Sequence, residues 1–274
     1  MLLGIDIGGT TISLGLVEGT EIVKRDRVPS FEKDATLDET IDYLCKCIES
    51  IITPEVKSIG VGVPTLVDVE KGIVYNAMNI KSWKEVPLKD LLEKRFGIPV
   101  FVNNDANCYV LGAAARLKKK YGVVVGVTLG TGTGIGIMAG DRLVCGDNCG
   151  AGEIGSVPYN GKDFESFCSK KFFTSRGWSP MEASKAAAEG NRDAIQFFDD
   201  FGKHLGELLS LVMYSYDPGC IVFGGGIANT YEYFKNNMMR ALRKRYPYGH
   251  ALDRLEIEVM PQDDVALLGA SLLS

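Results

Sequence analysis

Short apolar runs broken by glycine-rich turns open the chain and return near its middle. Residues 3–23, LGIDIGGTTISLGLVEGTEIV, and residues 125–144, VGVTLGTGTGIGIMAGDRLV, both give a strand, a Gly/Thr turn, a second strand, a Gly-centred turn and a third strand. Gly4, Gly8 and Gly15 align with Gly126, Gly130 and Gly136. Chance similarity of two hairpins is the simpler alternative, but a match through two turns and three strands favours an internal duplication.

The segments after each hairpin alternate between helical and strand patterns. Apolar spacing in the first half predicts helices at 37–52 and 87–96 and strands at 58–63 and 99–102. In the second half it predicts helices at 193–214 and 231–245, strands at 220–223 and 256–260, and a short helix at 265–273. Two similar α/β halves predict two domains, residues 1–105 with 265–274 and residues 106–264, and a ligand cleft between them.

Composition and charge narrow the classes of partner. The 274 residues are 46% hydrophobic and 24% charged, as in ordinary globular proteins, and the formal net charge of −5 gives no basic field for nucleic acid. Seven irregularly spaced cysteines and a strand-like start in place of a signal peptide predict reduced thiols in the cytoplasm. Residues 121–140 are uncharged over a membrane-spanning length, but their glycines and threonines disfavour a helix, so we expect no membrane partner.

The glycines indicate a particular kind of nucleotide site. The chain has no G-x-x-x-x-G-K-[ST], and the middle segment has no G-x-G-x-x-G, so neither a P-loop nor a dinucleotide fold is favoured. Glycines in hairpins can serve only to permit positive φ. The duplication favours two loops whose bare backbone and hydroxyls clasp phosphate, and the third cluster lies before a predicted helix, where backbone can lie flat against a nucleotide. The cofactor-binding candidates are Gly8, Gly9, Thr10 and Thr11 in the first loop, Gly130, Thr131, Gly132 and Thr133 in the second, and Gly224, Gly225 and Gly226 in the third cluster.

Five motifs in order resemble those of the ROK family of repressors, open reading frames and sugar kinases, and they cover nearly the whole chain. They are Asp6–Thr11 (DIGGTT), Val102–Asn107 (VNNDAN), Gly130–Gly134 (GTGTG), Gly150–Gly155 (GAGEIG) and Val222–Gly226 (VFGGG). The resemblance implies the duplicated actin-like, ribonuclease H-like ATPase fold. It also implies ATP with Mg²⁺, transfer of the γ-phosphate to a hexose, commonly at the 6-hydroxyl, and a homodimer.

Asp105 follows a predicted strand and precedes a predicted helix, where Asn and Asp are favoured as N-caps. By resemblance it is also the base that accepts the sugar hydroxyl proton, and the two roles are compatible. The resemblance makes Asn104 a sugar ligand and Asp6 a residue that holds Mg²⁺ through water, with no direct metal ligand among the site residues. The other candidate sugar ligands are Asn79, Glu153 and Glu165, although solvated loop residues of the same types would have no such role.

The chain departs from the family at its zinc site. Many members have a histidine where this chain has Ser156, and a cysteine cluster where residues 157–165 contain no cysteine. Cys145, Cys149 and Cys168 lack the spacing of zinc ligands, so we expect no structural zinc. Because the missing histidine normally touches the sugar, Ser156 leaves the substrate open, and Lys162 or Tyr159 are candidates to fill the gap.

Three functions follow from these features. The first is an ATP-dependent hexose kinase with glucose as the default, because residues 79–108 resemble ROK glucokinases most; N-acetylmannosamine, allose, fructose and a β-glucoside are the alternatives. The second is a ROK repressor, which carries an added N-terminal helix-turn-helix that this chain is expected to lack. The third is a sugar sensor without activity or a different actin-like ATPase, against which an intact Asp105 and two phosphate loops argue.

Overall fold

Each half of the duplicated pattern forms its own five-stranded sheet. The computed structural model describes residues 1–77 and 79–274. It divides into two compact units, the first made of Met1–Lys119, Leu143–Ala151 and Asp263–Ser274, the second of Lys120–Arg142 and Gly152–Gln262. The sequence-based domain boundary after residue 105 differs from this division, because the helix that follows belongs with the first sheet.

The first unit has the strand order β3-β2-β1-β4-β8. Its strands are β1 (Leu2–Ile7), β2 (Thr11–Glu18), β3 (Glu21–Pro29), β4 (Ile59–Val63) and β8 (Val100–Asn104). Its helices are α1 (Leu37–Glu49), α2 (Leu88–Phe96), α3 (Asp105–Arg116) and α10 (Gln262–Ser271). The three short strands β5 (Val67–Asp68), β6 (Ile73–Tyr75) and β7 (Glu85–Pro87), which the sequence did not predict, form a separate small sheet.

The second unit repeats this arrangement with the order β11-β10-β9-β14-β15. Its strands are β9 (Val123–Leu129), β10 (Thr133–Ala139), β11 (Arg142–Leu143), β14 (Cys220–Gly224) and β15 (Glu256–Val259). The hairpin β12 (Pro158–Tyr159) and β13 (Lys162–Asp163) and the 3-10 helices η1 (Glu153–Ser156) and η2 (Gly226–Thr230) lie outside the sheet. Its helices are α4 (Glu165–Cys168), α5 (Lys170–Thr174), α6 (Pro180–Ala188), α7 (Arg192–Tyr216), α8 (Tyr231–Arg245) and α9 (Gly249–Leu252).

The strand registers confirm the internal duplication. Gly4 faces Gly15 across the antiparallel pair β1–β2, and Gly126 faces Gly136 across the corresponding pair β9–β10. In each unit the first strand then pairs in parallel with a later strand, β4 or β14. The aligned glycines therefore occupy equivalent places in two sheets of the same topology.

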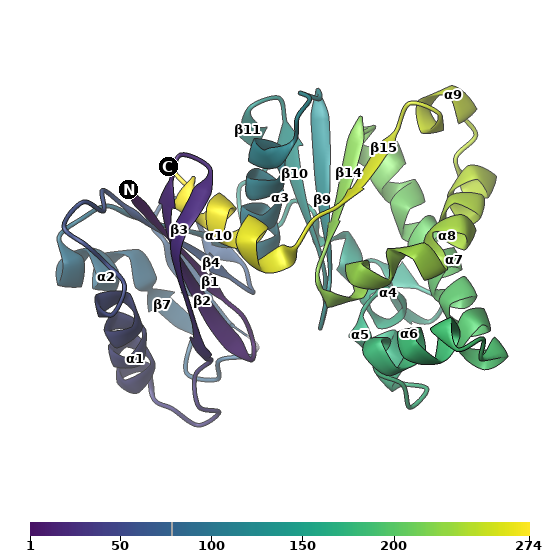
Figure 1. The fold of residues 1–274 in the computed structure, drawn as a ribbon. Coiled ribbons are helices and arrows are strands. Elements are labelled where there is room, and N and C mark those ends of the chain that lie inside the picture. Colours follow the sequence, from purple (N-terminus) through teal and green to yellow (C-terminus); the bar gives the residue numbers. More distant parts are fainter. Residues whose placement is uncertain (78) are drawn as a thin grey trace. The chain divides into compact units, whose positions relative to one another are not determined.

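The C-terminal helix closes the first unit. Figure 1 shows α10, in yellow, beside the purple N-terminal strands. It packs directly on the sheet because glycines leave room for its backbone: a Cβ on Gly4 would lie 2.0 Å from the carbonyl oxygen of Leu267, and one on Gly60 would lie 1.7 Å from that of Ala270. In the second unit, Gly202 and Gly206 of α7 allow a similarly close approach to α8.

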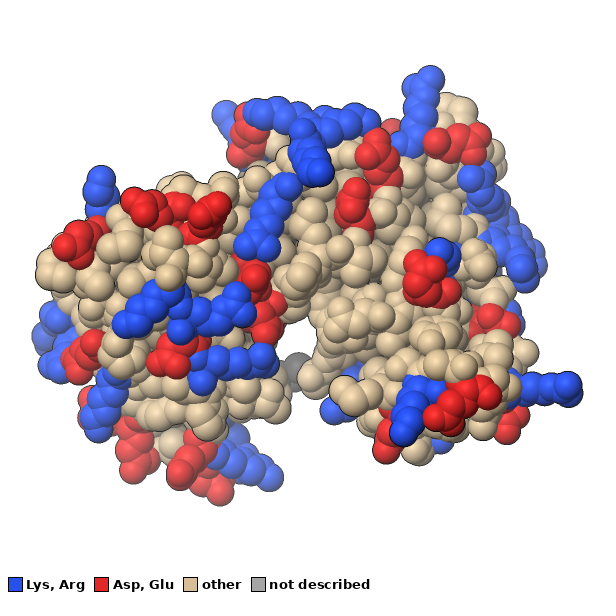
Figure 2. All heavy atoms as spheres, viewed as in Figure 1, with Lys and Arg blue, Asp and Glu red and all other residues tan. Residues whose placement is uncertain are grey.

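The uncharged stretch at residues 121–140 forms the β9–β10 hairpin. No helix within the described part of the chain is long and apolar enough to span a membrane. On the face drawn in Figure 2, lysine and arginine side chains are interspersed with aspartate and glutamate. This mixture accords with the modest net charge of −5.

Candidate active site

The junction between β8 and α3 presents two of the predicted site residues. Asn104 is the N-cap: its side-chain oxygen accepts hydrogen bonds from the backbone N–H of Ala106 at 2.9 Å and of Asn107 at 3.4 Å, and its amide donates to the carbonyl of Thr65 at 3.3 Å. Asp105 is the first helical residue, and its Oδ1 accepts from the Ala106 N–H at 2.8 Å. The capping role predicted for Asp105 thus belongs to Asn104, because the strand runs two residues further than predicted.

A group of carboxylates surrounds the end of β1. Asp6 lies within the protein, although part of the residue is accessible to solvent. Its pKa is raised to about 7, by burial and then by the negative charges of Asp105 and Asp263. Arg27 opposes this shift, and its Nη1 lies 2.7 Å from a carboxylate oxygen of Asp263. Arg27 and Asp263 were not predicted as site residues, since nothing in the local sequence pattern connects a strand near the N-terminus with the start of α10.

The first phosphate-binding candidate is the tight turn between β1 and β2. The Gly8 N–H donates to the carbonyl of Thr11 at 2.9 Å, and Ser30 secures the turn by donating from its N–H to the Thr10 carbonyl at 2.9 Å and from its hydroxyl to the Gly8 carbonyl at 2.8 Å. Gly9 and Thr10 are exposed at the tip. The hydrogen bonds from Ser30 therefore fix the turn, while the backbone at its tip is accessible to an anion.

Asn79 lies against this turn. A Cβ on Gly9 would be 3.1 Å from the Asn79 amide nitrogen, so a side chain there would crowd it. The segment carrying Asn79 is anchored by Trp83, which is 1% exposed and donates from Nε1 to the Thr40 hydroxyl at 2.8 Å. The first unit thus brings the predicted sugar loop and the predicted phosphate loop together.

The second phosphate-binding candidate, between β9 and β10, is covered by the α4–α5 segment. Gly130 donates to the carbonyl of Gly132 at 3.0 Å and accepts from the Lys170 N–H at 2.8 Å. The Thr133 N–H donates to Oε2 of Glu165 at 3.2 Å, and the other oxygen of Glu165 pairs with Lys171 Nζ at 2.5 Å. Glu165, predicted as a sugar ligand, therefore lies on this loop, and Lys171 is a charged neighbour that the sequence analysis missed.

Glu153 begins the 3-10 helix η1 after Gly152. Gly152 has φ +94°, and a Cβ there would lie 2.0 Å from the Ile135 carbonyl oxygen, so the turn packs directly on β10. Partial burial and then the nearby Glu165 carboxylate raise the pKa of Glu153. The carboxylates of Glu153 and Glu165, both predicted sugar ligands, therefore repel one another electrostatically.

The third glycine cluster follows β14. Gly225 has φ +86°, and a Cβ there would lie 2.2 Å from the Leu129 carbonyl oxygen. Gly226 opens η2, which leads into α8. A bulky residue cannot replace Gly225 here, and the exposed backbone precedes helical N–H groups that favour negative charge.

An aromatic cluster lies where many family members have their zinc loop. The ring of Tyr159 stacks on Phe164 at 4.1 Å between centroids, and its hydroxyl is 3.0 Å from His204 Nδ1. Burial lowers the pKa of His204, which favours a neutral ring. Within the described residues there is no group of three or more His, Cys, Asp or Glu side chains that could hold a metal ion. Ser156 is exposed, and the expected lack of zinc stays a prediction.

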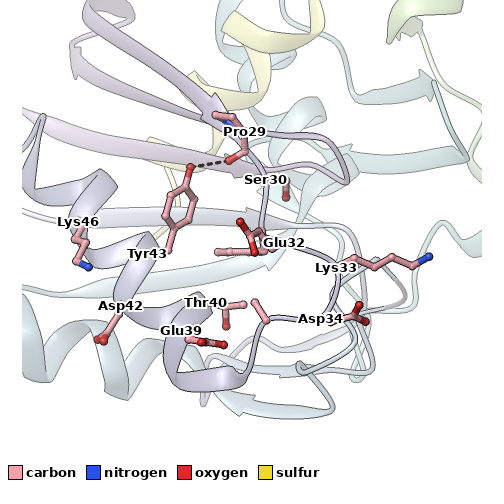
Figure 3. A pocket seen from close by; sticks show the side chains of 12 residues that line it. Pro29, Ser30, Glu32, Lys33, Asp34, Glu39, Thr40, Asp42, Tyr43 and Lys46 are labelled. Carbon is pink, nitrogen blue, oxygen red and sulfur yellow. Dashed lines mark hydrogen bonds between the residues drawn. The ribbon is translucent and has the colours of Figure 1, made fainter.

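A pocket of about 800 Å³ lies beside the loop between β3 and α1 in the first unit (Figure 3). Residues 29–35 and five residues of the following helical segment, Glu39, Thr40, Asp42, Tyr43 and Lys46, line it. Tyr43 spans one side by donating from its hydroxyl to the Pro29 carbonyl at 3.0 Å. Ser30, which holds the first phosphate turn, also borders it, but none of the predicted site residues lines it in the described part of the chain.

The ROK family model, described as "ROK family", matches residues 2–274. This chain belongs to the ROK family. A glucokinase of Thermotoga maritima is 31% identical over 273 residues, covering 84% of this chain and 83% of its own length. An N-acetyl-D-glucosamine kinase of Escherichia fergusonii is 28% identical over 260 residues, covering 84% of this chain and 85% of its own.

Among solved structures, a ROK family glucokinase from Streptomyces griseus in complex with glucose and AMPPNP superposes with a TM-score of 0.82 and 25% identity, covering 98% of this chain and 97% of that one. The predicted family is confirmed, and with it the actin-like ATPase fold of ROK sugar kinases. The roles of individual site residues stay predictions.

Proposed function

We propose that this ROK protein is an ATP-dependent sugar kinase that transfers the γ-phosphoryl group of ATP to the 6-hydroxyl of a hexose, with glucose as the substrate. The observation that carries this proposal is the position of Asp105 at the start of α3, directly after β8, in the unit that also holds the Gly8–Thr11 turn. The similarity to glucokinases over more than four fifths of the chain supports it.

In this proposal each predicted residue has a defined role. Asp105 accepts the proton of the attacking hydroxyl, and Asn104, held in its capping geometry, orients the sugar beside it. Glu153 and Glu165 in the second unit and Asn79 in the first accept or donate to the other hydroxyls, because each unmatched polar group in a closed site costs affinity. The two glycine turns supply backbone N–H groups for the phosphates.

The carboxylates around Asp6 fit a hydrated magnesium ion. Burial, and then the charges of Asp105 and Asp263, raise the pKa of Asp6 against the opposing effect of Arg27, so a cation beside these carboxylates would favour the ionised form of Asp6. Mg²⁺ prefers oxygen ligands and keeps several waters, so contact through water suits a site without a compact ligand cluster in the described residues. When bound, the ion would neutralise charge that develops on the transferred phosphoryl group.

N-acetyl-D-glucosamine should be compared directly with glucose as a substrate, because N-acetyl-D-glucosamine kinases are among the relatives. The two sugars differ only at the 2-substituent, so the choice depends on room and partners near that position. N-acetylmannosamine, allose, fructose and a β-glucoside complete the panel. The homodimer implied by the family resemblance and the cytoplasmic location predicted from the cysteines stay predictions that size-exclusion chromatography and cell fractionation can test.

Asp105→Asn tests the proposal. ADP release coupled to a dye is measured over the sugar panel for the wild type, for Asp105→Asn and for Asp141→Asn, a matched change at a carboxylate that is 90% exposed. We expect a loss in kcat of about 10²–10⁴-fold in Asp105→Asn, the range for removing a general base, with glucose binding retained and Asp141→Asn unaffected. An unchanged rate in Asp105→Asn contradicts the role of the base, and a wild type that no sugar stimulates contradicts the kinase.

A further inference from the structure

Two cysteines in the loop at residues 143–151 lie side by side. Asn107 Nδ2 lies 3.7 Å from the sulfur of Cys145 and 3.6 Å from that of Cys149. The side-chain oxygen of Asn103 is 3.9 Å from the first sulfur and 3.4 Å from the second. Both thiols therefore share the same two amides, at the end of β8 and in the first turns of α3.

The two thiols differ in reactivity. Cys145 is partly exposed, and its interaction with Cys149 lowers the pKa of Cys145 below that of an ordinary thiol, which favours its thiolate. Cys149 is 2% exposed, and the same interaction raises its pKa, so it keeps its proton. Burial also raises the pKa of Cys108 and Cys168. The pair thus combines an accessible nucleophile with a protonated neighbour.

The backbone of the loop holds Cys149 in an unusual conformation. Its φ is +56°, a region that side chains other than Asn and Asp rarely adopt and that costs about 1 kcal/mol or more. Its sulfur lies 3.4 Å from the side-chain oxygen of Asn103, which also accepts the backbone N–H of Asn104 at 2.8 Å. Since Asn104 is also the N-cap of α3, the thiol is connected through Asn103 to the junction that carries Asp105.

We propose that a hydroperoxide oxidises Cys145 and Cys149 to a reversible disulfide, and that this bond lowers sugar phosphorylation by disturbing Asn104. The second part rests on the proposed kinase function, whereas the first part does not.

The chemistry balances in two steps. The Cys145 thiolate attacks one peroxide oxygen, the O–O bond breaks, and hydroxide leaves as water after taking a proton, so Cys145 becomes a sulfenic acid. The Cys149 sulfur then attacks the Cys145 sulfur, the S–O bond breaks, and a second water leaves with the thiol proton. Two thiols are oxidised by two electrons and one hydrogen peroxide is reduced to two waters. A dithiol such as dithiothreitol reverses the reaction.

Disulfide formation must move atoms that contact the junction. An S–S bond is about 2.0 Å long, well below the distances of thiols in contact, so the two sulfurs have to approach each other. Asn103 then loses its thiol contacts, and its side-chain oxygen, which accepts the Asn104 N–H, shifts with them. Displacements of about 1 Å near a reacting group can reduce a rate up to roughly 100-fold.

Peptide mapping tests the disulfide. The folded protein is treated with hydrogen peroxide, alkylated and digested without reduction. Trypsin cleaves after Arg142 and Lys162, so both cysteines lie in the single peptide 143–162. We expect this peptide to lose two hydrogen atoms in mass and to escape alkylation, and to be alkylated twice after dithiothreitol. A sulfinic acid on Cys145 with Cys149 still alkylated, or disulfides only among other cysteines, overturns the proposal.

Kinetics on the same samples test the coupling. We expect oxidation to lower kcat/KM for glucose about tenfold or more, and dithiothreitol to restore it. Cys145→Ser should abolish both the mass change and the inhibition, while Cys45→Ala, a change in helix α1, should leave both intact. If Cys149→Ser does not fold, the partly exposed Cys145 still allows the test. A disulfide that leaves the kinetics unchanged overturns the coupling, whereas a reduced protein without activity refutes only the kinase.

Discussion

Asp6 shows how neighbouring charges set the behaviour of one residue. It is the last residue but one of β1, where its partners in register are Gly62 on the parallel strand β4 and Ser13 on the antiparallel strand β2, and only the more distant Arg27 on β3 opposes the shift. Asp105 and Asp263 then add repulsion to the cost of burial, and the pKa of Asp6 rises to about 7. A carboxylate that is hard to ionise without a cation is suited to bind one.

This environment predicts a pH-dependent stability. The folded-state pKa of Asp6 lies above its unfolded value of 3.8, so its contribution to stability is complete below about pH 4 and is lost as the pH rises through about 7. Asp6→Asn should therefore unfold at a higher temperature than the wild type at pH 8, with a smaller gap at pH 5. At about 1.4 kcal/mol per pKa unit, the free energy of unfolding of Asp6→Asn rises by at most about 4 kcal/mol. The rise should be smaller than this limit because Asp6 is partly accessible to solvent.

Thermal unfolding of both proteins at the two pH values checks this expectation. Magnesium at pH 8 should stabilise the wild type more than Asp6→Asn, because only the ionised carboxylate favours the cation. Asp141→Asn, at an exposed turn, should follow the wild type throughout. An equal gap between Asp6→Asn and the wild type at both pH values contradicts the assigned environment.

Sequence patterns predicted the secondary structure around the candidate site better than the contacts of its residues. The strand before Asp105 was predicted correctly in kind, but its end was placed two residues early, so Asn104 was not expected to cap α3. The position of Glu165 on Thr133 could not be predicted either, because the two residues are brought together only by tertiary packing. Local propensity has no information about such contacts.

At the scale of elements, the α4–α5 segment is bound to the second phosphate turn at several points. The Lys170 N–H donates to the Gly130 carbonyl, and the Thr133 hydroxyl donates to the Cys168 carbonyl at 2.9 Å. Glu165 takes the N–H of Thr133, a donor that an incoming phosphate could also use. The ammonium of Lys171 therefore compensates a carboxylate that would otherwise repel a triphosphate.

Lys171→Met should weaken ATP binding. Removing the cation leaves the Glu165 charge uncompensated beside the turn, and the pKa of Lys171 is itself raised by its hydrogen bond to Glu165. We expect KM for ATP to rise roughly two- to fivefold, corresponding to ~0.5–1 kcal/mol for a half-exposed pair, and the effect to shrink in high salt. Initial rates at low and high ionic strength measure it.

Lys235→Met provides the matched control, since Lys235 pairs with Glu232 on the surface of α8. Its KM for ATP should equal that of the wild type at both ionic strengths. If Lys171→Met behaves in the same way, Glu165 and Lys171 do not face the nucleotide.

At the scale of the whole molecule, the duplication accounts for both sheets, and the sequence predicted it from the aligned glycines. The helices α7, α8 and α10 were also predicted close to their observed bounds, because long apolar periodicity is a strong signal. Strands β5 to β7, of two or three residues each, are too short to show any period. Their existence depends on pairing with one another in a loop region.

The first unit combines the two ends of the sequence. Strand β1 begins at Leu2, and α10, which covers it, ends at Ser271. The seat of α10 consists of glycines far apart in sequence: Gly4 and Gly60 on the strands, and Gly112 on α3, where a Cβ would lie 1.9 Å from the Val265 carbonyl oxygen. The helix pattern alone could not reveal this seat, because each glycine is also compatible with an ordinary strand or helix. The unit is complete only when the last residues of the chain are in place.

Gly60→Ala should destabilise the first unit through this seat. The added Cβ would lie 1.7 Å from the Ala270 carbonyl oxygen, so α10 must move away from β4. Overpacking in a core costs about 1–3 kcal/mol, and contact with backbone places Gly60→Ala at the upper end, measured as a lower midpoint in urea.

Gly122→Ala is the matched control, because a Cβ there meets nothing within 4 Å and the residue does not have a positive φ. Since α10 also carries Asp263 beside Asp6, Gly60→Ala should lower the pKa of Asp6 and narrow the stability difference between pH 5 and pH 8. Equal urea midpoints for the two glycine variants would mean that α10 does not pack on β4 as described.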